Sequence, residues 1–456
     1  MKKKLTIAML CLLSMTSMAQ QKKIWNETEK EKEERLAWWT ADRFGMFIHW
    51  GTYSLAARHE WVKKLERISD EEYQKYFDNF NPDLYDPAEW AKLAKAAGMK
   101  YAVITTKHHE GFTLFDSEYT DYKMTNTPYG KDGLREWVEA FRAEGLKIGF
   151  YYSLIDFHHP DYTIDIQHPQ QPASDEEYAA LNKDRDMSIY REYLKNQVTE
   201  LLTNYGKIDM LWLDFSFPGE HGKDRDDWGS VELLKLVRKL QPHILVNDRA
   251  DLREYEGGWD FGTPEQVRSS NWPVYKGEKV PWETCQTLTG SWVYNRDSPF
   301  WKDTKQLLVL LIESVSKGGN LLLNVGPTGR GKIENKAENA LLSMGEWMKY
   351  NDRSIYGCTE APETIEVPGN TLLTYNPGTN RLYVHLLDYP GNSLTMLGMK
   401  GKIKYAQLLH DASVIPISSP TGYWLENMGL KEDDIFLSLP AVQPEVEIPV
   451  IELILY

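Results

Sequence analysis

The sequence predicts an α/β fold, a (β/α)8-like barrel that is somewhat irregular and is followed by a C-terminal all-β sandwich. Two observations predict the barrel: short apolar runs recur and end in polar side chains, and amphipathic stretches separate several of them. Strands that alternate with helices form a parallel sheet, and a barrel gathers the polar residues at its strand ends. The sandwich is predicted by a third observation, the loss of helical periodicity after about Asn351.

Eight apolar runs are candidate barrel strands. They are Phe44–Trp50, Tyr101–Thr106, Lys147–Tyr152, Ile208–Asp214, His243–Asp248, Trp259–Glu265, Val280–Cys285 and Asn320–Gly326. No convincing helix separates the runs between Asn247 and Cys285, so we expect this half of the barrel to be irregular. A doubly wound open sheet is the alternative, but no glycine-rich phosphate loop follows the first run.

Helices between these runs are indicated by apolar residues at a spacing of three or four. The sets are Trp90, Ala94 and Ala97; Tyr190, Leu194, Val198 and Leu202; and Leu308, Leu311, Ile312 and Val315. Glycines at 98, 145 and 206 stand where such helices should end, as C-terminal caps do.

The chain is long enough for a large domain and a smaller one. We predict a catalytic barrel over residues 25–351 and a sandwich over residues 352–456. In the second part, Thr371–Tyr375, Arg381–Leu387 and Val446–Leu455 are short β-rich runs separated by Pro-Gly, Asn-Pro and Gly-Asn turns.

Residues 1–19 have the pattern of a secretory signal peptide. Three lysines precede the apolar stretch Leu5–Leu13, and Ser17-Met18-Ala19 provides small residues at a cleavage site. The apolar stretch is too short for a stable membrane anchor, and no other stretch resembles a transmembrane helix. We therefore expect export across the inner membrane, to the periplasm or the medium.

Charge and cysteine content narrow the possible partners. Cleavage after Ala19 removes three lysines and no acids, which takes the net charge from −15 to −18. Such an acidic protein disfavours nucleic acid and anionic membranes as partners and suits a neutral substrate.

Only two cysteines, Cys285 and Cys358, would remain after cleavage of the signal peptide, so we expect buried free thiols rather than a disulfide framework. Nothing in the sequence predicts the oligomeric state.

Carboxylates at strand ends are the first candidates for chemistry. Asp214 and Glu265 end runs in the same half of the predicted barrel. Hydrolysis of a glycosidic bond needs one carboxylate as nucleophile and one carboxyl group as proton donor. The structural alternative is that these acids cap helices or pair with Arg249.

Three histidines, His49, His108 and His109, also follow strand-like runs. A His-His pair raises the possibility of a metal, but no HExxH or Asp-x-His spacing accompanies it. Neutral imidazoles that bind substrate hydroxyls fit better, because each ring offers one donor and one acceptor. We expect neither a catalytic metal nor a cofactor.

Nine motifs in order resemble the family 29 glycoside hydrolases, the retaining α-L-fucosidases. The likeness spans roughly Trp25 to Asn351, and the β-rich tail agrees with the family's C-terminal sandwich. The motifs are Arg43–Gly51, Glu60-Trp61, Lys107–Phe112, Tyr151–Ser153, Trp212–Asp214, Asn247–Arg249, Thr263–Gln266, Trp282-Glu283 and Gly319–Pro327.

The resemblance implies a role for each matching residue. Asp214 would be the nucleophile that forms a fucosyl-enzyme intermediate. Glu265 is the favoured acid/base and Glu283 its rival, because the position of this residue varies within the family. Residues matching those that hold fucose hydroxyls are His49, Glu60, Trp61, His108, His109, Tyr152 and Arg249. Trp212 and Trp292 match the aromatic walls of the pocket.

The implied activity is exo-hydrolysis of terminal α-L-fucosyl linkages on an oligosaccharide or glycoconjugate, with retention of configuration. The alternatives are a related retaining glycosidase acting on α-L-galactosides and a catalytically inactive fucose-binding protein. The motifs do not assign the linkage preference. The long acidic loop 156–184 is a candidate roof over the leaving-group site.

Overall fold

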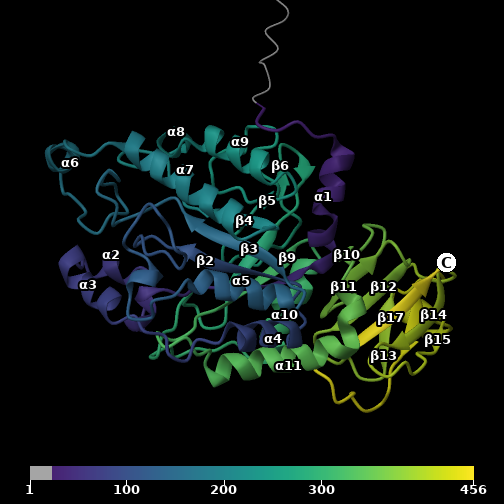
Figure 1. Cartoon of the computed structure of the whole chain (residues 1–456). Helices are drawn as coiled ribbons and strands as arrows, with labels where there is room; N and C mark the ends of the chain where they lie inside the picture. The colour runs from purple at the N-terminus through teal and green to yellow at the C-terminus, as the bar shows by residue number, and fades with distance from the viewer. Residues whose placement is uncertain (1–22) are drawn as a thin grey trace, which may run out of the picture.

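A computed structural model of the chain describes residues 23–456. Figure 1 shows a parallel sheet surrounded by helices, and beside it a β-rich region that contains the C-terminus. The structure therefore has the predicted irregular (β/α)8-like barrel followed by an all-β sandwich. The predicted signal peptide, residues 1–19, lies outside the described residues.

Seven parallel strands form the barrel sheet, in the order β5-β4-β3-β2-β1-β9-β8. Almost all of their residues are buried, which explains why they are apolar runs in the sequence. The strands are β1 (Phe44–Ile48), β2 (Tyr101–Lys107), β3 (Lys147–Ser153), β4 (Met210–Asp214), β5 (Leu245–Val246), β8 (Glu283–Thr287) and β9 (Asn320–Val325).

The barrel is closed between β5 and β8 by a segment that is not a regular strand. The predicted run Trp259–Glu265 makes only isolated bridges, from Phe261 to Asn247, from Gly262 to Trp282 and from Glu265 to Cys285. Pro264 has no N–H to donate to a ladder, which is one physical reason for the interruption. This segment is the irregular part of the barrel, and it interrupts what would otherwise be an eight-stranded ladder.

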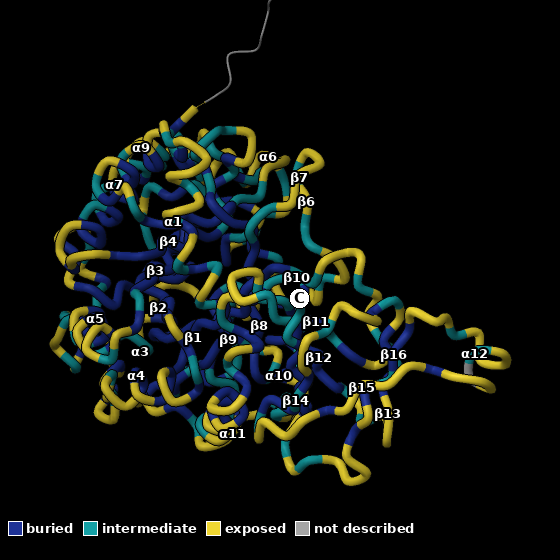
Figure 2. Tube along the Cα trace, turned by 90° about the vertical axis from the view of Figure 1, so that its right-hand side faces the viewer, coloured by how far each residue is buried: buried dark blue, intermediate teal, exposed yellow. Residues whose placement is uncertain are grey.

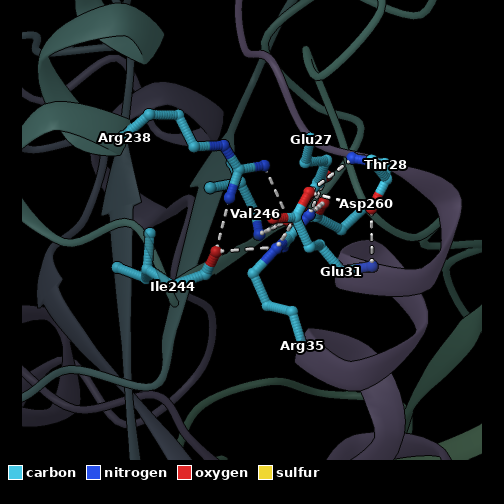
Figure 3. Close-up of polar contacts among 8 residues, drawn as sticks. All are labelled: Glu27, Thr28, Glu31, Arg35, Arg238, Ile244, Val246 and Asp260. Carbon is cyan, nitrogen blue, oxygen red and sulfur yellow. Dashed lines mark hydrogen bonds and ion pairs between the residues drawn. The ribbon is translucent and has the colours of Figure 1, made fainter.

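Figure 3 shows how side chains replace ladder hydrogen bonds beside this segment. The carboxylate of Asp260 accepts from the backbone N–H of Val246 at 2.7 Å, from Arg35 at 2.7 Å and from Arg238 at 2.8 Å. Burial alone would raise the pKa of Asp260, but the two guanidinium groups outweigh it and lower that pKa. The network ties β5 to the N-terminal helix.

Eleven α-helices belong to the described part of the chain before the sandwich. They are α1 (Glu29–Asp42), α2 (Val62–Leu65), α3 (Asp70–Asp78), α4 (Pro87–Ala96), α5 (Gly133–Ala143), α6 (Asp175–Asn182), α7 (Met187–Asn204), α8 (Arg225–Trp228), α9 (Ser230–Leu240), α10 (Thr304–Val315) and α11 (Asn335–Asn351). The three sets of apolar residues that predicted helices belong to α4, α7 and α10, and they are buried. Gly98, Gly145 and Gly206 have positive φ just beyond α4, α5 and α7, as predicted for caps.

The C-terminal region contains two antiparallel sheets, of five strands in the order β10-β11-β12-β17-β14 and of three in the order β13-β16-β15. Its strands are β10 (Thr359–Glu360), β11 (Thr371–Asn376), β12 (Arg381–Leu386), β13 (Ser393–Met396), β14 (Ile403–Leu408), β15 (Ile417–Ser418), β16 (Ile435–Ser438) and β17 (Val450–Leu455). A short helix, α12 (Tyr423–Asn427), and the hairpin β6 (Val274–Tyr275) and β7 (Glu278–Lys279) complete the elements of both regions, apart from single turns of 3-10 helix.

One hydrophobic cluster fills most of the barrel and extends to Tyr383 and Val450 of the C-terminal region, and a second cluster lies within that region. Figure 2 shows the barrel strands as a dark-blue buried centre, with exposed segments around them. The two regions also touch, since the indole of Trp347 on α11 donates to the carbonyl of Ile448. The domain boundary between residues 351 and 352 stays a prediction.

Cys285 and Cys358 are both free and buried, as the sequence predicts. Within residues 23–456, no helix has the length and apolar character that crossing a membrane requires.

Candidate active site

A pocket opens at the carboxyl ends of the barrel strands. Its lining comes from β1, β3, β4 and β8 and from the segments that follow β1, β2, β4, β5 and β8. The lining residues are Phe47, His49, Glu60, Trp61, His108, His109, Tyr151, Trp212, Asp214, Phe215, Glu265, Cys285 and Trp292.

Strand alternation decides which side chains reach this pocket. Trp212 and Asp214 are two residues apart on β4 and therefore share a face. In the parallel pairing of β3 with β4, Tyr151 lies beside Trp212 and Ser153 lies beside Asp214. Tyr151 therefore faces the pocket, and the residue after it faces the surrounding helices.

Asp214 is buried at the floor of the pocket, and both of its oxygens are held. Arg249 Nη1 donates to Oδ1 at 2.9 Å, and the Tyr151 hydroxyl donates to Oδ2 at 2.9 Å. Burial raises the pKa of Asp214 to about 6, and nearby Glu265 adds to the rise, while Arg249 and Tyr151 oppose it. The carboxylate is thus fixed in direction and is ionised at neutral pH.

Arg249 connects Asp214 to a second carboxylate, Glu265. Its Nη2 lies 3.2 Å from Glu265 Oε2, and it is itself anchored by hydrogen bonds of 3.0 Å to the hydroxyl and the carbonyl of Thr263. The guanidinium also lies over the ring of Trp212, at 5.0 Å from the ring centroid. The Glu265 side chain is 43% exposed, whereas the Asp214 side chain is 11% exposed.

Two of the three pocket histidines have tautomers that their partners determine. His49 Nδ1 lies 2.6 Å from Asn324 Oδ1, whose amide nitrogen donates to the Trp292 carbonyl. His109 Nδ1 lies 2.6 Å from the hydroxyl of Ser153, and this hydroxyl donates its own proton to the Ile155 carbonyl. Both rings must therefore carry the proton on Nδ1, which leaves Nε2 as an acceptor.

Burial lowers the pKa of His49 and His109 well below its usual range, so both rings are neutral. Nε2 of His109 lies 4.0 Å from Asp214 Oδ2. Two neighbouring acceptors of this kind can share the proton of a ligand hydroxyl placed between them.

The remaining walls combine aromatic rings with one more acid. Trp61 packs on His109 at 4.3 Å between centroids, and Trp292 packs on His49 at 5.1 Å. Glu60 lies beside them and is buried, and burial raises the pKa of Glu60 to about 7. A small polar ligand with an apolar edge, such as a deoxyhexose, suits this lining.

Residues 11–353 match the model of a protein family described as alpha-L-fucosidase. The chain belongs to the α-L-fucosidase family. The family is one of glycoside hydrolases, and the motifs identified in the sequence therefore mark a fucosidase-type pocket.

Solved structures of fucosidases share the whole architecture. Alpha-L-fucosidase isoenzyme 1 from Paenibacillus thiaminolyticus is 45% identical, covers 93% of this chain and 99% of its own, and superposes with a TM-score of 0.85. A GH29 alpha-L-fucosidase from Bacteroides thetaiotaomicron is 27% identical over 95% of this chain and 97% of its own, with a TM-score of 0.79. That structure is a covalent intermediate trapped with 2-fluoro-fucosyl fluoride in a Glu-to-Gln variant. Human tissue alpha-L-fucosidase is 28% identical over 410 residues, 81% of this chain and 82% of its own.

The fucosidase pocket brings together most of the residues predicted from the sequence. Those that line it are His49, Glu60, Trp61, His108, His109, Trp212, Asp214, Glu265 and Trp292. Arg249 does not line the cavity itself but contacts both Asp214 and Glu265. Their individual roles stay predictions.

Tyr152 was predicted to bind substrate, and its position contradicts this. Its hydroxyl donates to Gln197 on α7 at 2.8 Å, and the ammonium of Lys107 lies over its ring. It points out of the barrel because it follows Tyr151 on the strand. Tyr151 takes the place in the pocket that the sequence analysis assigned to Tyr152.

Glu283, the predicted rival acid/base, is also outside the pocket. It is fully buried, and its Oε2 accepts from the hydroxyl of Tyr101 and from the indole of Trp39 at 3.3 Å. Burial raises the pKa of Glu283 to about 7. Glu283 begins β8, whereas catalytic groups of a barrel follow its strands.

We expect Glu283→Gln to leave kcat on an aryl α-L-fucoside within about threefold of wild type, because the amide fits the same space and touches no substrate. Steady-state kinetics together with thermal unfolding measure this. A loss of kcat of a hundredfold or more in a folded variant would contradict the assignment of Glu283 to the barrel interior.

The pocket also contains residues that were not predicted from the sequence. Tyr151, Phe47, Phe215 and Cys285 line the cavity without having been predicted. Alternation was the available signal, because Phe47 precedes His49 by two residues and Tyr151 precedes Ser153 by two residues. Applying it needs the register of neighbouring strands, which one sequence does not contain.

The pocket histidines do not form a metal-binding group in the described residues. The one group of three candidate ligands found within residues 23–456 is Asp175, Glu220 and His221, which does not line the pocket. The expectation that catalysis needs no metal stays a prediction.

The loop 156–184 packs partly against the residues that line the pocket. It contains α6, and buried Asp165 pairs with Lys223 at 3.1 Å. Phe157 packs against Trp61 and His109 of the pocket. A role as a roof over the leaving group stays a prediction.

Proposed function

We propose that the protein hydrolyses terminal α-L-fucosyl linkages of glycans with retention of configuration. The observation that carries the proposal is the pair of carboxylates bound to one guanidinium, Asp214 on the pocket floor and Glu265 at its exposed edge. Retaining hydrolysis needs such a pair, one as nucleophile and one as acid and then base.

In the first step, Asp214 attacks the anomeric carbon while Glu265 gives its proton to the departing oxygen. Tyr151 and Arg249 hold the carboxylate so that a lone pair points into the pocket. In the second step, Glu265 takes a proton from water, which attacks the fucosyl ester from the face that the leaving group vacated. Two inversions restore the α configuration.

The pocket lining supports binding of a terminal sugar. It offers acceptors at His49 and His109 for hydroxyl groups and indole rings for an apolar edge. The remainder of the glycan would extend past Glu265, the more exposed of the two carboxylates.

The direct test is proton NMR of the first sugar released from an aryl α-L-fucoside. The proposal expects α-L-fucose before mutarotation, and β-L-fucose as first product would contradict retention. The aryl α-L-galactoside is the matched control, because its ring differs only by a hydroxyl at C6. A pocket rejects such an added hydroxyl by about a hundredfold at most, and equal or faster turnover would favour the galactoside as substrate.

The pH dependence follows from the state of Asp214. Protonated Asp214 is no nucleophile, so kcat/KM should fall as the pH drops below about 6. Because Arg249 lowers the pKa of Asp214, Arg249→Met should raise that pKa and move the acidic limb upward by about one pH unit or more. An acidic limb that does not move in the variant would contradict this electrostatic role.

We also propose export of the protein, on the basis of the signal-peptide pattern in residues 1–19. N-terminal sequencing of protein from the periplasm or medium should begin at Gln20. Full-length protein retained in the cytoplasm would contradict export.

A further inference from the structure

Glu110 is a buried acid behind the pocket that the mechanism does not use. It is 3% exposed, and neither of its carboxyl oxygens has a hydrogen-bond partner in the described structure. It lies behind the ring of His108, with Oε2 3.4 Å from His108 Nδ1, an atom that also lacks a partner. Two buried polar groups without a partner therefore face each other behind the pocket.

Among the described residues, Lys63 and Lys107 lower the pKa of Glu110, but neither forms an ion pair with it. The titratable and charged groups that surround it are Tyr53, Lys63, Tyr73, Lys107, Tyr122 and Asp156. The two lysines are bound elsewhere, Lys63 to Asp70 at 2.6 Å and Lys107 to Asp156 at 3.0 Å. A buried carboxylate without an ion pair costs far more free energy than a buried neutral carboxyl group, which needs only a hydrogen-bond partner. Burial accordingly raises the pKa of Glu110 to about 8.

We propose that Glu110 is a positioning residue whose carboxyl proton is donated to Nδ1 of His108, so that Nε2–H of His108 faces the pocket as a hydrogen-bond donor. The distance from Glu110 Oε2 to His108 Nδ1 exceeds a normal hydrogen-bond length by about 0.3 Å, and a small side-chain rotation would remove this difference. The proposal rests on the proposed function only for its kinetic consequence.

This assignment completes a pattern across three imidazoles. Asn324 makes His49 an acceptor, Ser153 makes His109 an acceptor, and Glu110 makes His108 a donor. A sugar hydroxyl both gives and accepts one proton, so a donor beside two acceptors fits neighbouring hydroxyls. The pattern also selects against a ligand that offers only hydrogen-bond acceptors to Nε2 of His49 and Nε2 of His109.

The first test is the tautomer of His108 in the protein without substrate. The chain has eleven histidines, and ¹⁵N NMR of histidine-labelled protein distinguishes a protonated ring nitrogen from a bare one. The His108 signal is assigned from its loss in His108→Gln. At about pH 6.5, below the pKa of Glu110, we expect Nε2–H on His108 and Nδ1–H on His49 and His109. Nδ1–H on His108 would overturn the proposal, whether or not the protein cleaves fucosides.

The second test compares two length-matched variants. Glu110→Gln keeps a donor toward His108 and should keep the Nε2–H tautomer and a KM near that of wild type. Glu110→Met removes the donor, and KM for an aryl α-L-fucoside should rise about tenfold while kcat changes about twofold or less. An unchanged KM in folded Glu110→Met, or an equal rise in both variants, would overturn the proposal.

The pH profile separates positioning from simple packing. Above pH about 8, Glu110 ionises and becomes an acceptor, which draws the proton of His108 to Nδ1 and removes the donor from the pocket. KM of wild type should therefore rise on the alkaline side, and Glu110→Gln should lose this rise because an amide does not titrate. An identical alkaline rise in the two proteins would contradict the role of Glu110.

Discussion

Asp214→Ala should lower kcat on an aryl α-L-fucoside by about 10⁴-fold or more, the loss typical of removing a covalent catalyst. The reason is that Tyr151 and Arg249 hold only this carboxylate against the pocket floor, and no other carboxylate in the described pocket has both contacts. Steady-state kinetics with circular dichroism measure the effect in folded protein.

Asp184→Ala is the matched control, because that carboxylate is 86% exposed and does not line the pocket. It should keep the activity of wild type. Azide added to Asp214→Ala should restore turnover and yield β-L-fucosyl azide, since a small anion in the vacated space attacks from the same face. Turnover by Asp214→Ala within tenfold of wild type would contradict the nucleophile assignment.

Glu265→Gln should lower kcat/KM on a fucosyl oligosaccharide by about 10²- to 10⁴-fold, because a sugar leaving group needs a proton. Fucosyl fluoride should still form the intermediate at close to the wild-type rate, since fluoride departs without protonation. The second step then lacks its base, so the covalent intermediate should accumulate. Stopped-flow kinetics with the two substrates measure both effects.

The comparison with Glu283→Gln makes this result specific. Both substitutions replace a carboxyl group by an amide, but of the two residues only Glu265 lines the pocket and contacts Arg249. Equal losses on oligosaccharide and fluoride in Glu265→Gln would contradict a role in protonating the leaving group. A selective loss in Glu283→Gln instead would return that role to Glu283.

The regular half of the barrel could be predicted because its strands are buried on both faces. Runs such as Phe44–Ile48 and Met210–Asp214 have no competing interpretation once polar residues end them. The segment Trp259–Glu265 was predicted as a strand because it has the same composition. Here the side chain of Asp248 accepts from the backbone N–H of Thr263, and the side chain of Asp260 accepts from the backbone N–H of Val246 on β5. Side-chain pairing of this kind leaves no periodic signal in the sequence.

Site residues within a recognisable motif could be predicted from the sequence. Site residues that depend on strand register or strand boundaries could not. Trp212 and Asp214 share a face of β4 by alternation, and both of these motif residues line the pocket. Choosing Tyr151 over Tyr152 requires the register between β3 and β4, a contact between distant parts of the chain. Choosing Glu265 over Glu283 requires knowing that Glu283 begins its strand rather than ends it.

The central claim is that Asp214 forms a bond to the anomeric carbon, while Glu265 donates a proton in the first step and accepts one in the second. Peptide mass spectrometry of Glu265→Gln treated with 2-fluoro-fucosyl fluoride, the reagent used to trap the Bacteroides intermediate, tests it most directly. The account predicts one fluorofucosyl group, carried by the peptide that contains Asp214 and absent from Asp214→Ala. A label on Glu60 or on any other carboxylate, or no label while the variant turns over, would contradict it.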